Sequence, residues 1–160
     1  MARIQEHPNV CAMLDAVAWS EIGPALLAAS DDGYNVIVGS TPERPSLFHD
    51  YADHPHILVH LSQTLSSTAA GRYQILGKYA DAYKASLDLP DFGPESQDRI
   101  AVQLIKECHA YGLVTAGQFD QAVYKCRSRW ASLPGASYGQ HENKIEDLRA
   151  AYENAGGALA

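Results

Sequence analysis

The chain has 160 residues, a net charge of −7 at pH 7 and 46% hydrophobic residues. This length suits one domain whose core is large enough to fold without disulfides or metals, and the composition excludes an intrinsically disordered chain. Because binding to a phosphate backbone depends on clustered Lys and Arg, the acidic balance argues against a nucleic-acid partner.

The first ten residues, MARIQEHPNV, lack the charged and then apolar pattern of a signal peptide. No apolar run approaches the roughly 18 residues that span a bilayer, so we expect folding in the cytoplasm without membrane insertion. Cys11, Cys108 and Cys126 are odd in number and lack CxxC spacing. We therefore expect three small core residues rather than a disulfide framework or a zinc site.

The first predicted element is a helix over residues 8–21, with Pro8 in its first turn. Its apolar stripe comprises Val10, Met13, Leu14, Val17 and Ala18. Glu21 lies at the C-terminal end, where the helix dipole favours a protonated carboxyl by up to about 1 kcal/mol. Two interpretations remain open: Glu21 is a solvated helix end, or it is an acid held against apolar neighbours such as Trp19.

The chain from about residue 31 to 62 predicts a small antiparallel sheet, because turns and Pro breaks separate β-branched and alternating stretches. Helical spacing then predicts helices over 69–87, 94–112, 116–130 and 141–157, with a loop at LPGASYG. The predicted fold class is therefore α+β, rich in helix, with one small sheet inserted after the first helix.

Histidines and aspartates between the predicted strands form the densest group of metal-ligand residue types. They are His49, His54, His56 and His60, with Asp50 and Asp53. Because zinc sites favour regular spacing on rigid elements and this stretch predicts a loop, we expect no metal and no cofactor. Motifs for acyl transfer, nucleotide binding and calcium binding are missing, and Ser20 and Ser132 have no obvious base beside them in sequence.

Two further stretches offer polar side chains. STAAGRYQIL places small residues beside an arginine and an amide that can bind a polar ligand, and SLPGASYGQ is a loop shaped by Pro and Gly. The candidate contacts are Arg72, Tyr73, Gln74, Tyr138 and Gln140. Each stretch taken alone is more typical of an ordinary turn than of a binding site.

Six stretches occur in order along nearly the whole chain. They are AWSE at 18–21, DGYNVIVG at 32–39, DYADHP at 50–55, STAAGRYQIL at 67–76, SQD at 96–98 and WASLPGASYGQ at 130–140. Together they resemble the lambda-type phage endolysins, which are lytic transglycosylases of peptidoglycan with a lysozyme-like fold. The resemblance implies a helical lobe, a lobe with a small three-stranded antiparallel sheet, and a saccharide cleft between them.

The same resemblance implies a mechanism with one carboxyl group. Glu21 matches the essential acid of the family, which cleaves the bond between N-acetylmuramic acid (MurNAc) and N-acetylglucosamine (GlcNAc) without water. The C6 hydroxyl of MurNAc attacks C1 and closes a 1,6-anhydro ring, so Glu21 acts first as acid and then as base.

The family also implies which side chains contact the sugars. Tyr73 and Gln74, with Arg72, are expected on one side of the cleft, and Tyr138 and Gln140 on the other. Tyr34 and Tyr51 are expected to shape the sheet side, where aromatic rings suit sugar faces. One departure is local: family members commonly follow the acid with Gly and Thr, whereas this chain has Ile22 and Gly23.

Two other functions stay open on the sequence. A hydrolytic muramidase would need a second carboxylate from Asp31, Asp32, Asp50 or Asp53. A saccharide-binding phage protein without activity would keep the fold alone. For the leading interpretation we expect a monomer that acts on peptidoglycan glycan strands, and that waits in the bacterial host cytoplasm until a holin-type membrane protein releases it to the cell wall.

Overall fold

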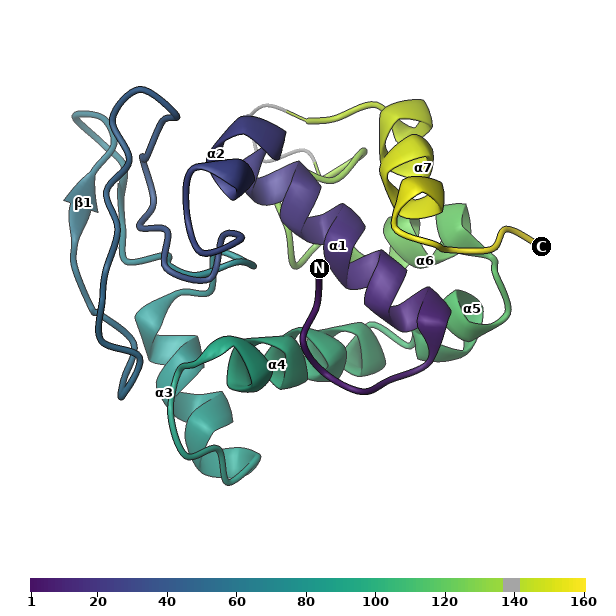
Figure 1. Cartoon of the computed structure of the whole chain (residues 1–160), viewed down its shortest axis with the longest axis horizontal. Helices are drawn as coiled ribbons and strands as arrows, with labels where there is room; N and C mark the ends of the chain where they lie inside the picture. The colour runs from purple at the N-terminus through teal and green to yellow at the C-terminus, as the bar shows by residue number, and fades with distance from the viewer. Residues whose placement is uncertain (137–141) are drawn as a thin grey trace. The chain divides into compact units, whose positions relative to one another are not determined.

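The structure, a computed structural model, describes residues 1–136 and 142–160 of the chain (Figure 1). These residues fall into two units, of which the first comprises Met1–Glu21 with Ala101–Ala160 and the second comprises Ile22–Ile100. None of the helices in the described ranges combines the length and the apolar character that a bilayer crossing requires.

The helix predicted over residues 8–21 is present as α1 (Pro8–Ile22). The proline suits the first helical turn, where its missing N–H has no intrahelical partner to lose. Beyond the predicted stripe, Ala12, Ala16 and Ser20 are also interior, so α1 is buried on nearly every side. A helix with small or apolar residues around its circumference is typical of a central element.

Three further helices of unit 1 are α5 (Tyr111–Thr115), α6 (Phe119–Cys126) and α7 (Ile145–Asn154). Helices α6 and α7 lie side by side (Figure 1), and the rings of Phe119 and Tyr152 stack with centroids 4.3 Å apart. Both rings are at most 2% exposed, so this stack belongs to the core of unit 1.

Backbone conformation corrects several predicted helix boundaries. The helix predicted over 116–130 begins at Phe119, after Gly117 at φ +73°, and ends at Cys126. Helix α4 (Pro94–Glu107) starts as predicted but ends before His109, which has φ +55°. A positive φ is incompatible with a right-handed helix, so each of these residues interrupts the predicted pattern.

Unit 2 contains α2 (Pro24–Ala28), β1 (Val59–His60), β2 (Ser66–Ser67) and α3 (Gly77–Ser86), and its boundary with unit 1 falls within α4. The antiparallel strands β1 and β2 pair Val59 with Ser67 and His60 with Ser66. The sheet of the described residues therefore has two strands, and the expectation of three is wrong.

Within the described residues, the β-branched run of residues 36–38 forms isolated bridges and no third strand. Gly39 follows it at φ +81°, and its residues pair only at single positions, as in the bridges Val36 to Leu47 and Ile37 to Ala70. A strand needs several consecutive extended residues to form a ladder.

The helix predicted over 69–87 begins only at Gly77. The segment before it turns instead, since Gly71 has φ +79°, Gln74 has φ +48°, and Ala70 forms a bridge with Ile75. A β-carbon on Gly71 would lie 2.2 Å from the Gln97 side-chain oxygen, so this close approach requires glycine. The predicted sugar contacts at 72–74 therefore lie in a tight turn and not on a helix.

Candidate active site

Glu21 is the next-to-last residue of α1, and its side chain is partly exposed. Its Oε1 accepts a hydrogen bond from the Ser132 hydroxyl at 2.5 Å, and the backbone N–H of Ser132 points to the same oxygen at 3.4 Å. Both residues belong to unit 1, although 111 positions separate them along the chain. The fold thus brings the predicted acid against a polar segment from the other end of the sequence.

Desolvation by the surrounding protein raises the pKa of the Glu21 carboxyl, and the hydrogen bonds from Ser132 act in the opposite direction. Desolvation is the larger effect, so the net shift is upward. The position at the C-terminal end of α1 disfavours the carboxylate in addition. Of the two interpretations that the sequence left open, the structure favours a held carboxyl that retains its proton to higher pH.

Two more polar side chains lie behind Ser132. The Ser20 hydroxyl is 2.7 Å from the Ser132 hydroxyl, and the Asn143 side-chain amide donates to Ser20 Oγ at 3.0 Å. Sequence reasoning missed this arrangement because it examined the serines only as nucleophiles. The available signals were weak: Ser20 directly precedes Glu21, and Ser132 lies in the WASLPGASYGQ stretch.

Three of the predicted sugar contacts are interior side chains of unit 2. Tyr34, Arg72 and Tyr73 are at most 2% exposed. The hydroxyls of Tyr34 and Tyr73 donate to the same oxygen of the buried Asp98, at 2.8 and 2.5 Å. Burial and the Asp98 charge raise the pKa of both tyrosines, so their hydroxyls remain donors. Side chains without exposed surface support the interior of unit 2, and sequence reasoning gave Asp98 no role although the SQD stretch contains it.

Arg72 is held by several groups in unit 2. Its guanidinium forms an ion pair with Asp32 at 2.8 Å and lies 5.1 Å from the centre of the Tyr34 ring. Its backbone N–H donates to the side-chain oxygen of Gln97 at 2.9 Å. These contacts hold the Arg72 side chain inside unit 2, and they fix the turn that follows Gly71.

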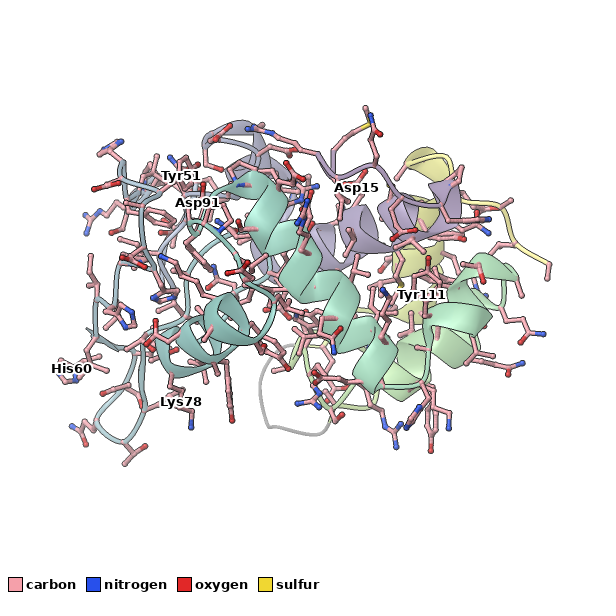
Figure 2. All side chains as sticks on the ribbon, turned by 90° about the horizontal axis from the view of Figure 1, so that it is seen from below. Asp15, Tyr51, His60, Lys78, Asp91 and Tyr111 are labelled. Atoms are coloured by element: carbon pink, nitrogen blue, oxygen red, sulfur yellow. The ribbon has the colours of Figure 1, made fainter. Side chains whose placement is uncertain are left out.

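The other predicted contacts are placed differently. Gln74 is partly exposed, and its side-chain amide donates to the Gly71 carbonyl at 2.9 Å. Tyr51 is also partly exposed, and its hydroxyl donates to Asp31 at 2.7 Å. Its backbone carbonyl accepts from the N–H of Phe92 at 2.8 Å, so Tyr51 lies close to Asp91, the residue before Phe92 (Tyr51 and Asp91 are labelled in Figure 2). Tyr138 and Gln140 lie outside the described residues.

Three of the four histidines that suggested a metal have other partners. His54 is buried, its pKa is lowered mainly by desolvation, and its ring bonds the Ile75 carbonyl at 2.9 Å. His56 contacts Asp81 at 3.0 Å, and His60 contacts Ser66 at 2.7 Å. Within residues 1–136 and 142–160, no group of three or more His, Cys, Asp or Glu residues is arranged to hold a metal ion.

The carboxylates considered for a hydrolytic mechanism also have structural partners. Asp31 accepts from Tyr51, Asp32 pairs with Arg72, and Asp53 pairs with Lys84. The fourth, Asp50, accepts from the backbone N–H two residues later at 2.8 Å. Each of these acids therefore has a local role within unit 2.

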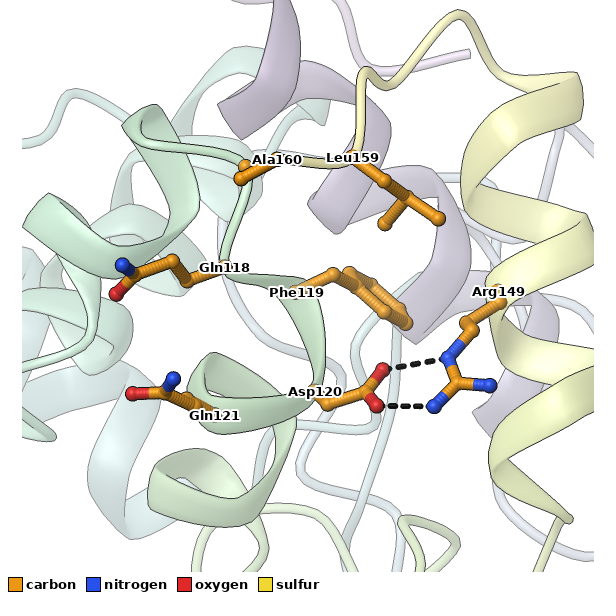
Figure 3. Close-up of a pocket in the computed structure, with 8 residues that line it drawn as sticks. Gln118, Phe119, Asp120, Gln121, Arg149, Leu159 and Ala160 are labelled. Carbon is orange, nitrogen blue, oxygen red and sulfur yellow. Dashed lines mark hydrogen bonds and ion pairs between the residues drawn. The ribbon is translucent and has the colours of Figure 1, made fainter.

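A cavity of about 300 Å³ lies in unit 1, beside the N-terminal end of α6 (Figure 3). Phe119 and Leu159 contribute its apolar wall. Asp120 and Arg149 contribute its charged wall. Two nitrogens of the Arg149 guanidinium, Nε and Nη2, donate to the two carboxylate oxygens of Asp120, so the two charges compensate each other. None of the predicted site residues lines this cavity.

Comparisons with known proteins agree along almost the whole chain. The family model described as Endolysin matches residues 11–159. The endolysin of Escherichia phage lambda is 47% identical over 149 residues, which cover 92% of this chain and 91% of the phage protein. The endolysin of Escherichia phage P2 is 42% identical over 165 residues, with both chains fully covered.

Solved structures give the same result. The structure of bacteriophage lambda lysozyme complexed with a chitohexasaccharide aligns with a TM-score of 0.91 and 44% identity, covering 98% of this chain and 99% of the other. A second structure of lysozyme from bacteriophage lambda aligns with a TM-score of 0.86 and 43% identity over the same shares. The fold is therefore lambda lysozyme-like.

Proposed function

The chain belongs to the endolysin family, and from this premise we propose that it cleaves the MurNAc–GlcNAc bond of peptidoglycan without water and leaves 1,6-anhydro-MurNAc ends. The observation that supports this most directly is the environment of Glu21. Its carboxyl has a raised pKa, and one of its oxygens is held by Ser132.

In the proposed reaction Glu21 transfers protons twice. The protonated carboxyl first gives its proton to the glycosidic oxygen, and the bond from that oxygen to C1 of MurNAc breaks. The C6 hydroxyl of the same MurNAc then forms a bond to C1 and gives its proton to the Glu21 carboxylate. Glu21 ends the cycle protonated, so a single side chain suffices and no water is consumed.

The contacts of the other acids fit this proposal. A hydrolytic enzyme needs a second carboxylate that activates water or attacks the sugar. Asp31, Asp32 and Asp53 instead accept hydrogen bonds or form ion pairs within unit 2. A saccharide ligand is also consistent with the relative whose structure was solved with a chitohexasaccharide.

For sugar binding we assign direct contact to the partly exposed side chains Tyr51 and Gln74, and keep Tyr138 and Gln140 as predictions. Tyr34, Arg72 and Tyr73 are given a supporting role instead, because their burial leaves almost no surface for a ligand. Release by a holin-type membrane protein remains part of the proposal and derives from the family resemblance.

Product analysis on purified murein tests this function. The wild-type protein should yield muropeptides with anhydro ends, each one water lighter than the product of hydrolysis. Glu21→Gln should lower the rate at least about 100-fold, since it removes the general acid and base. The matched control Glu153→Gln changes an exposed acid on α7 and should retain full activity.

Two outcomes would contradict the proposal. New reducing ends would identify a hydrolytic muramidase. Intact murein with measurable glycan binding would identify a saccharide-binding protein without activity. Circular dichroism of both variants verifies that a loss of activity does not reflect a loss of fold.

A further inference from the structure

The three polar side chains behind Glu21, namely Asn143, Ser20 and Ser132, form a continuous series of hydrogen bonds that we call the relay. The steps are 3.0 Å from Asn143 Nδ2 to Ser20 Oγ, 2.7 Å from Ser20 Oγ to Ser132 Oγ, and 2.5 Å from Ser132 Oγ to Glu21 Oε1. All members lie in unit 1. The proposed function does not by itself assign them a role.

The orientation of the relay follows from its first member. Asn143 Nδ2 also faces two backbone carbonyls, that of Ser20 at 3.2 Å and that of Ser132 at 3.5 Å. Carbonyl oxygens only accept, so the atom that faces them is the amide nitrogen, which only donates. Ser20 Oγ therefore accepts from Asn143, and its own proton is available for the nearest acceptor, Ser132 Oγ.

The same reasoning continues to Glu21. When Ser132 Oγ accepts from Ser20, its own proton is free to point to Glu21 Oε1. The backbone N–H of Ser132 points to that oxygen as well. Two donors thus converge on Oε1, whereas Oε2 has no hydrogen-bond partner among the described residues.

We propose that the relay makes Oε1 of Glu21 a constant acceptor and thereby makes Oε2 the oxygen that carries the proton, gives it to the glycosidic oxygen and takes it back. Because Oε1 accepts from Ser132 in both protonation states, the carboxyl does not have to rotate between its two tasks. Ser132 is accordingly a positioning residue for the proton transfer, and Ser20 and Asn143 orient it. This inference rests on the proposed function of Glu21.

The relay also predicts the sign of a measurable shift. A donor to the carboxylate stabilises the charged form, so Ser132 lowers the pKa of Glu21 against the larger effect of desolvation. Loss of that donor should therefore raise the pKa further. If a protonated Oε1 donated to Ser132 instead, the bond would stabilise the neutral form, and its loss would lower the pKa.

The test is a titration of Glu21 by carbon-13 NMR of the side-chain carboxyl, with Glu21→Gln used to identify the resonance. Ser132→Ala should raise the titration midpoint, and the alkaline limb of the activity profile should move by the same amount. Ser132→Thr keeps the hydroxyl and should restore both values. Ser20→Ala should move the midpoint upward by less, and it replaces Ser132→Ala if that variant does not fold.

A midpoint that stays constant or falls in Ser132→Ala would overturn the relay, even if activity were lost. The titration needs no substrate, so it tests the relay independently of the product analysis that tests the proposed reaction. Conversely, reducing ends from the wild-type protein would refute the proposed reaction while the titration still reports on the hydrogen bond to Oε1.

Discussion

Removal of the buried Asp98 carboxylate should destabilise unit 2 strongly. Asp98 is fully buried and accepts from the hydroxyls of Tyr34 at 2.8 Å and Tyr73 at 2.5 Å. A hydrogen bond to a charged group contributes about 1.5–3 kcal/mol, so Asp98→Ala should lower the free energy of unfolding by about 3–6 kcal/mol. Since a domain is stable by only about 5–15 kcal/mol, this is a large part of the total.

Urea denaturation measures this change. Tyr34→Phe and Tyr73→Phe each remove one donor and should each lower the free energy of unfolding by about 1.5–3 kcal/mol. The matched control on the same helix is Glu95→Ala, whose ion pair with Arg99 at 2.7 Å is more than half exposed and should contribute at most about 0.5 kcal/mol. A loss below about 1 kcal/mol in Asp98→Ala would show that the two tyrosine hydrogen bonds to Asp98 do not stabilise unit 2 to this extent.

The same variants separate support from sugar contact. If Tyr73 acts from the interior, Tyr73→Phe should lower stability while the KM for glycan stays within about twofold of the wild-type value. A large rise in KM with unchanged stability would instead return Tyr73 to the group of direct sugar contacts. The free energy of unfolding and KM are measured independently, so support from the interior and direct sugar contact give different results.

Two other predictions concern a thiol and a glycine. A hydrogen bond from Cys126 is the main cause that lowers the pKa of Cys108, so alkylation of Cys108 should reach half its limiting rate at a lower pH than alkylation of an ordinary thiol, and a midpoint at or above about 8.5 would contradict this. Gly71→Ala should lower the free energy of unfolding by about 2–4 kcal/mol, because Gly71 has a φ of +79° and the Gln97 side chain lies close to it. The control Gly112→Ala in α5 should be neutral or stabilising in the same urea experiment.

Local signals allowed the prediction of the elements that depend on neighbours in sequence. Pro8 and Pro94 mark the starts of α1 and α4 correctly, because proline is compatible only with the first turn of a helix. The segment before α3 had good helical spacing, yet it turns because Gly71 approaches Gln97 of another element. Such a contact forms only in the assembled fold, so no pattern of neighbouring residues predicts it.

The candidate site shows the same division. The position of Glu21 at the end of α1 leaves two interpretations open, and the resemblance of the AWSE stretch to the endolysins makes it the candidate acid. Its partner Ser132 lies 111 residues away, and nothing in the sequence states which hydroxyl meets which carboxyl oxygen. Likewise, Tyr34 and Tyr73 look like aromatic sugar contacts in the sequence, and only the long-range bonds to Asp98 place them inside unit 2.

The departure after Glu21 has a structural consequence for the acid itself. Gly23 has φ +80°, and Pro24 begins α2, so α1 cannot continue beyond Ile22. Glu21 is therefore confined to the last turn of α1, next to backbone carbonyls that have no partner within the helix. Their partial negative charge disfavours the ionised carboxyl, so this local sequence favours the protonated state of Glu21. Desolvation favours the same state, whereas the hydrogen bonds from Ser132 favour the charged one.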